Sequence, residues 1–469
     1  MRVKFDATRT VVLSAALSLS ACSTGSVQPS IDTPRRAEAG EVVEALPAAS
    51  VAVGRKLMII GNIDGKLVGN NSRDAIFTDR LAEDVGGAQH LRVLVVPAAS
   101  GAPAFLGGYL RSLFASRGVS AAQIEVAQIA NKDDLSTPSV DESTWANGAY
   151  DAAEISKVAR ANVIWFAGGN QNRLTSLLMT GQGNDTPFLA AVREKLEAQA
   201  LIVVGYSAGA AALSDPMIGN GTSFGALSLA PSTDPNCAEA NPICVAPGLG
   251  FVQASDSVII DQHFEERGRV ARLVRALALA DKHTGWGVSV NGALYVDLAK
   301  RTAEVVGNPG DATVTIVGRE GAAQNREQPG PPFLGDGYTV SVLGTGDVYA
   351  LPNPEQRHGV ASHLEASEVY QPFSSSFDAP SVLTDAFGHH VLTKKVSQLF
   401  ADSSPHASGA RVDAIALDTD EQDNATGFRL RFTADANSRV AKSEDAGYSI
   451  FGARLQFTAL EGKFTDLGS

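Results

Sequence analysis

The chain has 469 residues, of which 44% are apolar and 19% are charged, and its formal net charge is −13. This length is enough for about two or three compact domains with sizeable cores, and the balanced composition excludes a disordered or a membrane-embedded chain. The negative charge argues against general nucleic-acid binding, which needs a basic surface, and it suits a cationic substrate.

Residues 1–22 have the pattern of an export signal. Basic residues precede an apolar stretch from Val11 to Leu19, which is too short to span a bilayer. The following Leu-Ser-Ala-Cys, ending at Cys22, resembles a bacterial lipobox, in which the cysteine becomes the lipidated first residue. A soluble export signal with an incidental cysteine is the alternative. We therefore expect an exported protein, either lipid-anchored to the outer membrane or periplasmic or extracellular.

Residues 23–50 are rich in Ser, Pro, Ala and Glu and are expected to be a flexible tether. From residue 56 onward, short apolar runs alternate with helical stretches. The expected strands are 57–61, 91–96, 124–129, 162–166 and 201–204. The expected helices are 74–85, 105–116, 152–160 and 186–198. Apolar strands separated by helices predict an α/β fold, with a doubly wound parallel sheet that is covered by helices on both faces.

Three features suggest how the rest of the chain is organised. Strand-like runs at 293–296, 302–306 and 312–317 complete an α/β domain placed at 51–318. Residues 319–337, rich in Gly, Pro, Gln and Glu, are expected to be a linker. Alternating polar and apolar residues predict that 338–469 form a smaller β-rich accessory region.

The motif Gly-Tyr-Ser-Ala-Gly at 205–209 directly follows an expected strand and precedes an alanine-rich segment. A strand, G-x-S-x-G and a helix in this order hold a serine on a sharp turn, where a base can activate its hydroxyl group. Ser207 is therefore the candidate nucleophile, and the amide of Ala208 is a candidate donor to an oxyanion. A structural tight turn is the alternative interpretation.

His263 is the candidate base. It follows the apolar run 257–260 and precedes an expected helix over 265–280, so it is expected at the same sheet edge as Ser207. A structural loop histidine is the alternative. The other histidines, His389 and His390 among them, lie outside such a context.

Two further groups are expected at this edge. Gly169 and Asn170 follow the expected strand 162–166, and their amides are candidates for the other half of the oxyanion hole. Arg267, Arg269 and Arg272 follow His263, and their guanidinium groups suit a substrate carboxylate. A solvated helix face is the equally weighted alternative for the arginines.

Cys237 and Cys244 lie close enough in sequence to close a small disulfide loop in an oxidising compartment. Two free thiols are the alternative. The sequence has neither metal-ligand spacing nor a nucleotide fingerprint, so we expect no cofactor or metal.

Together these motifs resemble those of the cyanophycinases and related aspartyl dipeptidases, which are serine peptidases on a fold like that of flavodoxin and the class I glutamine amidotransferases. The resemblance covers about residues 57–317 and is most specific in the run Asp-Gln-His-Phe-Glu-Glu-Arg-Gly-Arg-Val-Ala-Arg-Leu at 261–273. It implies hydrolysis of cyanophycin, a poly-aspartate with arginine side chains, to β-aspartyl-arginine dipeptides through an acyl-enzyme on Ser207. It also allows a homodimer, and it implies roles for two sets of residues. The oxyanion hole would contain Gly169, Asn170 and Ala208, and the substrate groove would contain Gln171, Asp261, Arg267, Arg269 and Arg272.

The sequence departs from the family at the third member of the triad. The family has a glutamate in a run resembling G-I-G-I-D-E-x-T-A, and the matching run at 285–293 places Val290 there. Valine cannot accept the imidazole N–H, and loss of the orienting acid lowers the rate of serine proteases on the order of 10⁴-fold. Asp261, Asp297 and Asp256 are candidate replacements, and a slower dyad is the other outcome. A degenerate homologue that binds polymer, or an aspartyl dipeptidase or esterase on the same fold, are the alternative functions.

Overall fold

The computed structural model describes residues 53–63, 75–252, 258–320, 327–328, 330–352, 360–363, 382–383, 386–399, 411–419, 424–434, 438–443 and 447–463. The expected export signal with Cys22, the tether and Asp256 lie outside these residues. None of the helices in the described ranges has the length and the apolar character that crossing a bilayer requires.

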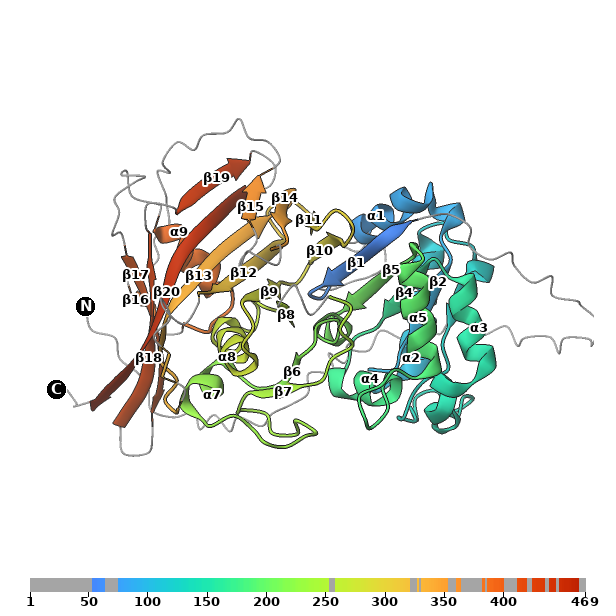
Figure 1. Ribbon diagram of the computed structural model, residues 1–469, viewed down its shortest axis with the longest axis horizontal. Helices are drawn as coiled ribbons and strands as arrows, with labels where there is room; N and C mark the ends of the chain where they lie inside the picture. The colour runs from blue at the N-terminus through green and yellow to red at the C-terminus, as the bar shows by residue number, and fades with distance from the viewer. Residues whose placement is uncertain are drawn as a thin grey trace, which may run out of the picture. The chain divides into compact units, whose positions relative to one another are not determined.

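Nine strands of the described chain form the first sheet (Figure 1). Their spatial order is β15 (Val360–His363), β14 (Asp347–Ala350), β11 (Thr302–Gly307), β10 (Gly292–Asp297), β1 (Gly54–Ile60), β5 (Ala200–Tyr206), β4 (Val163–Phe166), β2 (Val93–Val96) and β3 (Ile124–Val126). The strands from β1 to β3 in this order pair in parallel, and those from β15 to β1 pair antiparallel. Each residue of β2 and β4 is buried, as expected of strands covered on both faces.

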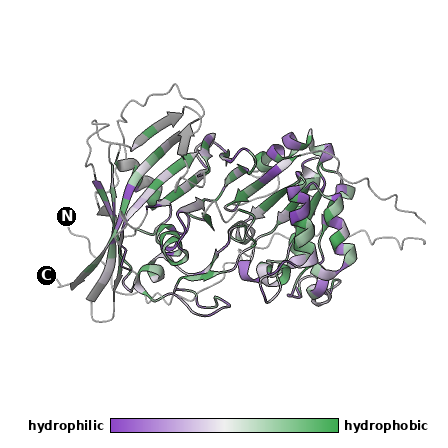
Figure 2. Ribbon diagram, in the orientation of Figure 1, coloured by the Kyte–Doolittle hydropathy of each residue, from purple (hydrophilic) through white to green (hydrophobic). Residues whose placement is uncertain are grey.

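Helices cover both faces of the parallel strands. They are α1 (Ala75–Val85), α2 (Pro103–Ser116), α3 (Ala152–Arg160), α4 (Gln171–Leu178), α5 (Pro187–Glu197) and the short α6 (Ala208–Ala211). Alternate strand residues enter two separate cores. Ile59 and Val203 pack with apolar residues of α4 and α5, whereas Met58 and Val204 pack with those of α1 and α2. Figure 2 shows these strands mainly in hydrophobic colours and the helices in mixed colours. The predicted α/β class is confirmed.

Several helices begin where the sequence supplies a cap. The side chain of Asp151 accepts hydrogen bonds from the first amides of α3, and Asn170 and Thr186 do the same for α4 and α5. Short 3₁₀ helices at Ala88–His90, Ala121–Gln123 and Glu142–Tyr150 complete the connections.

A second, mostly antiparallel sheet contains the remaining long strands. Its order is β16 (Val382–Leu383), β17 (Arg411–Thr419), β18 (Asn424–Thr433), β20 (Gly447–Lys463), β13 (Gly335–Gly344), β12 (Thr313–Arg319), β9 (Thr284–Val288) and β8 (Val258–Gln262), and β19 (Arg439–Ser443) pairs with β20. The other elements are a hairpin of β6 (Met217–Asn220) and β7 (Cys244–Ala246), and the helices α7 (Ser223–Ser228), α8 (Val270–Ala280) and α9 (Val391–Gln398). The apolar side chains of α8 share one core with β13, β18 and β20.

This second sheet runs through the expected boundary at 319–337. β12 pairs with β13 from Thr313 to Arg319, so strands on both sides of the expected linker are neighbours in one sheet. Within that segment, Phe333 is buried and Arg319 pairs with Glu327. The β-rich character expected of the C-terminal region is present, but β14 and β15 extend the first sheet, and the other strands of this region extend the sheet that begins with β8 and β9.

The strands that carry Ser207 and His263 belong to different sheets. β5 lies in the first sheet and β8 in the second, which differs from the single sheet edge expected from the sequence. The backbone after β1 connects them. The carbonyl of Ile60 accepts the amide of Ser207 at 2.9 Å, and the carbonyl of Gly61 accepts the amide of His263 at 3.4 Å.

Replacing Phe428 by alanine tests the shared core of the second sheet. Phe428 is 3% exposed and contacts the ring of Phe224 edge-on, so Phe428→Ala is expected to lower the free energy of unfolding by about 3–5 kcal/mol. Leu417→Ala on the neighbouring strand removes a side chain that is 39% exposed and serves as the control. Urea unfolding with equal losses for the two variants would contradict the shared core.

Candidate active site

Ser207 lies on a strained turn between β5 and α6. Its backbone has φ 53° and ψ −115°, a conformation that is costly for a residue with a side chain and is typical of nucleophile turns. The following Gly209 lies against the carbonyl of Phe166, where a Cβ would clash. The turn therefore depends on the small residues of the G-x-S-x-G motif.

Ser207 and His263 form a hydrogen-bonded pair. The distance from Ser207 Oγ to His263 Nε2 is 3.0 Å, although the residues come from two sheets. His263 directly follows β8, has φ 46° and is half-buried. A hydroxyl group bonded to a ring nitrogen is the arrangement in which histidine removes the proton of a serine nucleophile.

The surroundings of His263 keep its ring neutral. Burial, with the nearby positive charges of Arg267, Arg269 and Arg272, lowers the pKa of His263 to about 3. A ring with this pKa is unprotonated at neutral pH and can accept a proton from Ser207. The same environment makes the imidazolium ion, which forms when the proton arrives, costly.

Asp261, Arg269 and Arg272 form a buried ion cluster. The side chain of Asp261 is fully buried and accepts bonds from Arg272 Nε at 2.7 Å and Nη2 at 2.5 Å. Arg269 Nη1 lies 3.4 Å from Asp261, and Arg272 also donates to the carbonyl of Gly221 at 2.7 Å. These contacts all lie inside the protein, and the substrate contacts of the three residues stay a prediction. The side chain of Arg267 is exposed, and its contact with a substrate carboxylate stays a prediction.

The structure reduces the number of candidate donors to the expected oxyanion hole from three to two. The amide of Asn170 donates to the carbonyl of Ala99 at 2.9 Å, and its side chain caps α4, so its predicted role as an oxyanion donor is corrected. Gly169 has φ 143°, and a Cβ there would clash with that same carbonyl. Within the described residues, the amides of Gly169 and Ala208 donate to no hydrogen bond. They remain the two candidate donors.

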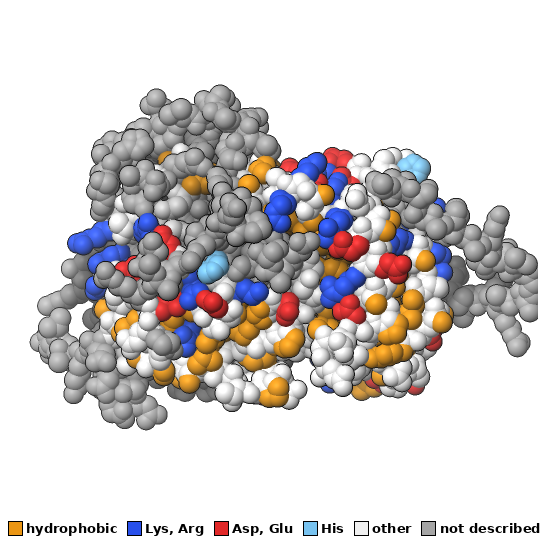
Figure 3. All heavy atoms as spheres, viewed as in Figure 1, with side chains coloured by type: hydrophobic (Ala, Val, Ile, Leu, Met, Phe, Trp, Pro, Cys, Tyr) orange, Lys and Arg blue, Asp and Glu red, His pale blue; other side chains and the backbone are white. Residues whose placement is uncertain are grey.

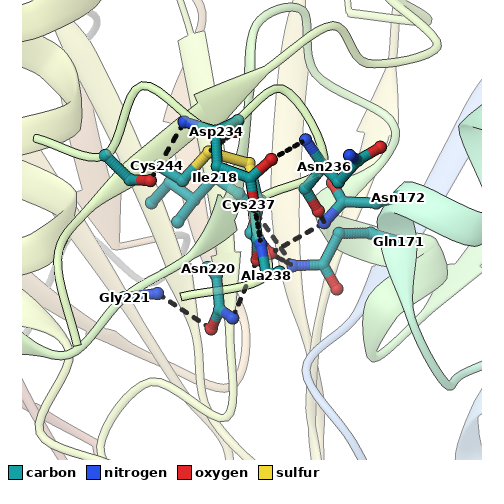
Figure 4. Close-up of a disulfide and its surroundings, with 12 residues drawn as sticks. Gln171, Asn172, Ile218, Asn220, Gly221, Asp234, Asn236, Cys237, Ala238 and Cys244 are labelled. Atoms are coloured by element: carbon teal, nitrogen blue, oxygen red, sulfur yellow. Dashed lines mark hydrogen bonds between the residues drawn. A yellow bond between two sulfur atoms is a disulfide. The ribbon is translucent and has the colours of Figure 1, made fainter. Parts of the chain in front are cut away.

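Gln171 lies near the loop that Cys237 and Cys244 close (Figure 4). Gln171 Nε2 donates to the carbonyls of Ile218 and Gly219 at 2.9 and 2.8 Å, so this amide holds β6 instead of contacting substrate as predicted. Cys237 and Cys244 form a disulfide with a Cα–Cα distance of 5.5 Å. The bridge therefore closes a loop that is attached to the first residues of α4.

A cavity of about 620 Å³ opens beside His263. Its lining residues are Asn62, His263, Glu266, Val290, Asn291, Gly310, Asp311, His389 and His390. Of these side chains, sequence reasoning assigned His263 and the position of Val290 to the site and missed the others. Glu266 lies three residues after His263 and was within reach of a local argument, whereas His389 and His390 come from a distant segment that no motif connects to the site.

Neither of the two expected replacements that the structure describes, Asp261 and Asp297, is hydrogen-bonded to His263. Asp261 is bonded in the ion cluster, and Asp297 lies opposite Lys56 at the other end of β1 from the catalytic pair. In the described part of the chain, no group of three or more His, Cys, Asp or Glu side chains is arranged to hold a metal ion. On the face that Figure 3 shows, the described acidic and basic side chains are interspersed.

Removing the charge of Asp261 tests its structural role. Asp261→Asn leaves two buried arginines without their carboxylate, and we expect a loss of about 3–5 kcal/mol in the free energy of unfolding. Glu197→Gln is the control, because it breaks an ion pair with Arg55 in which the glutamate is 61% exposed and should cost less than about 1 kcal/mol. Chemical denaturation measures both. A stable Asp261→Asn variant with only a raised KM would restore the role in substrate binding.

The low pKa of His263 predicts the pH dependence of Ser207 reactivity. A histidine is neutral, and can act as a base, at any pH above its pKa. The rate at which a fluorophosphonate labels Ser207 should therefore stay constant from about pH 7 to pH 5. Over the same range an ordinary histidine base becomes protonated and loses most of its activity. Arg267→Gln removes one charge that lowers the pKa, so the acid limb should move to higher pH. Arg267→Lys keeps the charge and should not move it. A wild-type rate that falls near pH 6.5 would refute this explanation.

Comparison with known proteins finds several relatives of modest identity. No protein-family model matches the chain. A cyanophycinase of Geminocystis herdmanii is 28% identical over 309 residues, which are 65% of this chain and 96% of that protein. Cyanophycinases of Trichormus variabilis and Synechococcus elongatus are 27% and 26% identical, over 50% and 64% of this chain and 64% and 81% of their own lengths. The crystal structure of a peptidase from an acI-B1 Actinobacterium has a TM-score of 0.39 and 18% identity, covering 56% of this chain and 89% of that one. The chain is therefore similar to curated cyanophycinases over about half to two thirds of its length, and this similarity supports a cyanophycinase-like peptidase.

Proposed function

We propose that the chain is a serine-type hydrolase that cuts the backbone of cyanophycin to β-aspartyl-arginine dipeptides. The observation that carries this proposal is the 3.0 Å hydrogen bond between Ser207 Oγ and His263 Nε2 on a nucleophile turn. The names of the relatives supply the substrate. The net charge of −13 suits a polymer whose side chains are arginines.

Every chemical step has a group in place. Ser207 Oγ attacks the backbone carbonyl carbon while His263 Nε2 takes its proton, and the amides of Gly169 and Ala208 donate to the resulting oxyanion. His263 then gives the proton to the leaving amine as the C–N bond breaks, which leaves an acyl ester on Ser207. Water, deprotonated by His263, attacks this ester, and the proton returns to Ser207 as the carboxylate product leaves.

The exposed Arg267 is the proposed contact for a substrate carboxylate. It lies four residues after His263 and is exposed, whereas Arg269 and Arg272 are buried and bonded to Asp261. A guanidinium group in this place can hold a free carboxylate by two parallel hydrogen bonds.

Substitution of Ser207 tests the proposed reaction. Ser207→Ala removes the nucleophile, and dipeptide release from purified cyanophycin should fall at least about 10³-fold. Ser176→Ala changes an exposed serine of α4 and is the matched control. Chromatography of the soluble products measures the rate, with aspartyl dipeptides and acyl esters as competing substrates. Wild-type protein that releases no dipeptide, or a fully active Ser207→Ala variant, would contradict the proposal.

The proposal includes export and a lipid on Cys22. An insoluble polymer outside the cell can be reached only by an exported enzyme, and the first residues have the pattern of an export signal. Cys22→Ala should move the protein from the membrane fraction to the soluble exported fraction, because the acyl chains that hold it are lost. Fractionation after labelling with a radioactive fatty acid measures this. Wild-type protein without label, found in the soluble fraction, would leave export alone as the remaining proposal.

A further inference from the structure

The catalytic histidine lacks a bonded acid. A base histidine works best when a carboxylate orients its ring and stabilises the imidazolium ion. Within the described residues, the one side-chain hydrogen bond of the His263 ring is the bond to Ser207. Three arginines nearby oppose a positive charge on this ring. A compensating negative charge is therefore needed where the proton arrives.

Two carboxylates line the cavity that contains His263, those of Glu266 and Asp311. Glu266 is the better placed of the two. It shares a single turn with His263, whose carbonyl accepts the amide of Arg267 at 3.2 Å. Asp311 belongs to the loop between β11 and β12 and is exposed.

The carboxylate of Glu266 is held in a fixed position at the cavity wall. Its Oε2 accepts the amide of Val290 at 3.0 Å, and its Oε1 lies 3.8 Å from His390 Nε2. The side chain is 15% exposed, so water screens its charge only in part. A carboxylate held from two sides loses little freedom when it interacts with a third group.

We propose that Glu266 is the positioning residue of this active site, and the inference rests on the proposed serine-type hydrolysis. Its carboxylate stabilises the imidazolium of His263 while the base holds the proton of Ser207, directly or through one water in the cavity. The titratable and charged groups around Glu266 are His263, His389, His390 and Asp311 of the cavity, with Arg267 and Arg269 nearby. Since Glu266 also offsets part of the charge of the two arginines, both effects favour a protonated His263 in the transition state.

Glu266→Gln is the decisive change, because glutamine has the same shape and its oxygen can still accept the amide of Val290. We expect kcat for cyanophycin to fall about 10²- to 10⁴-fold with KM nearly unchanged, and the acid limb of kcat to move to lower pH. Asp311→Asn removes the same charge from the same cavity and should have a much smaller effect. Adding Val290→Glu to the Glu266→Gln variant returns a carboxylate to the cavity wall. The double variant should have a kcat at least about tenfold higher than that of Glu266→Gln alone.

The outcomes separate this inference from the proposed function. A Glu266→Gln variant with the kcat and pH profile of the active wild type overturns the role of Glu266 alone. An equal loss in Asp311→Asn assigns the effect to the general potential of the cavity and overturns it as well. If Glu266→Gln lowers the stability of the protein and the double variant does not regain kcat, the role of Glu266 is purely structural and the inference is overturned. Wild-type protein that neither cleaves the polymer nor reacts at Ser207 with a fluorophosphonate removes the proposed function itself.

Discussion

The carbonyl groups of three consecutive residues, beginning with the last residue of β1, hold the active site together. Ile60, Gly61 and Asn62 accept the amides of Ser207, His263 and Asn291, at 2.9, 3.4 and 2.7 Å. These three donors come from the end of the first sheet, from the end of β8 and from the segment after β9. Because adjacent carbonyls point in different directions, one short segment can fix three others. These backbone hydrogen bonds therefore fix where the main chains of the nucleophile and the base lie relative to each other.

The ion cluster below His263 is the second constraint. Asp261 is the fourth residue of β8, and its two arginine partners are at the start of α8, so the cluster fixes how the turn between strand and helix leaves the sheet. Burying one carboxylate with two guanidinium groups leaves excess positive charge, and this charge lowers the pKa of the neighbouring histidine. The ion cluster fixes the position of His263, but its positive charge destabilises the protonated form of the ring. A carboxylate on the other side of the ring would balance that effect.

Local signals allowed much of the fold to be predicted. The helix expected at 152–160 is α3 to the residue, and the G-x-S-x-G turn lies where the strand and helix pattern placed it. Helix α8 begins at Val270 instead of 265, because the intervening residues form a turn that includes Gly268 at φ 53°. Periodicity shows which residues are apolar, but it does not show whether an arginine faces solvent or a buried carboxylate. For that reason neither interpretation of Arg269 and Arg272 included their ion pairs with Asp261. The pairing of β12 with β13 and the arrival of His389 at the cavity are long-range properties that no local pattern encodes.

The turn after His263 is hydrogen-bonded to residues close to the start of α9, much later in the chain. Glu265 is buried, and its carboxylate accepts the amide and the hydroxyl of Thr393, 128 residues further on, at the start of α9. The amide of His390 donates to the backbone carbonyl of the same glutamate. A segment remote from the nucleophile thereby becomes one wall of the reaction chamber. Changes within residues 386–399 would therefore reshape this wall while the bond between Ser207 and His263 stays intact.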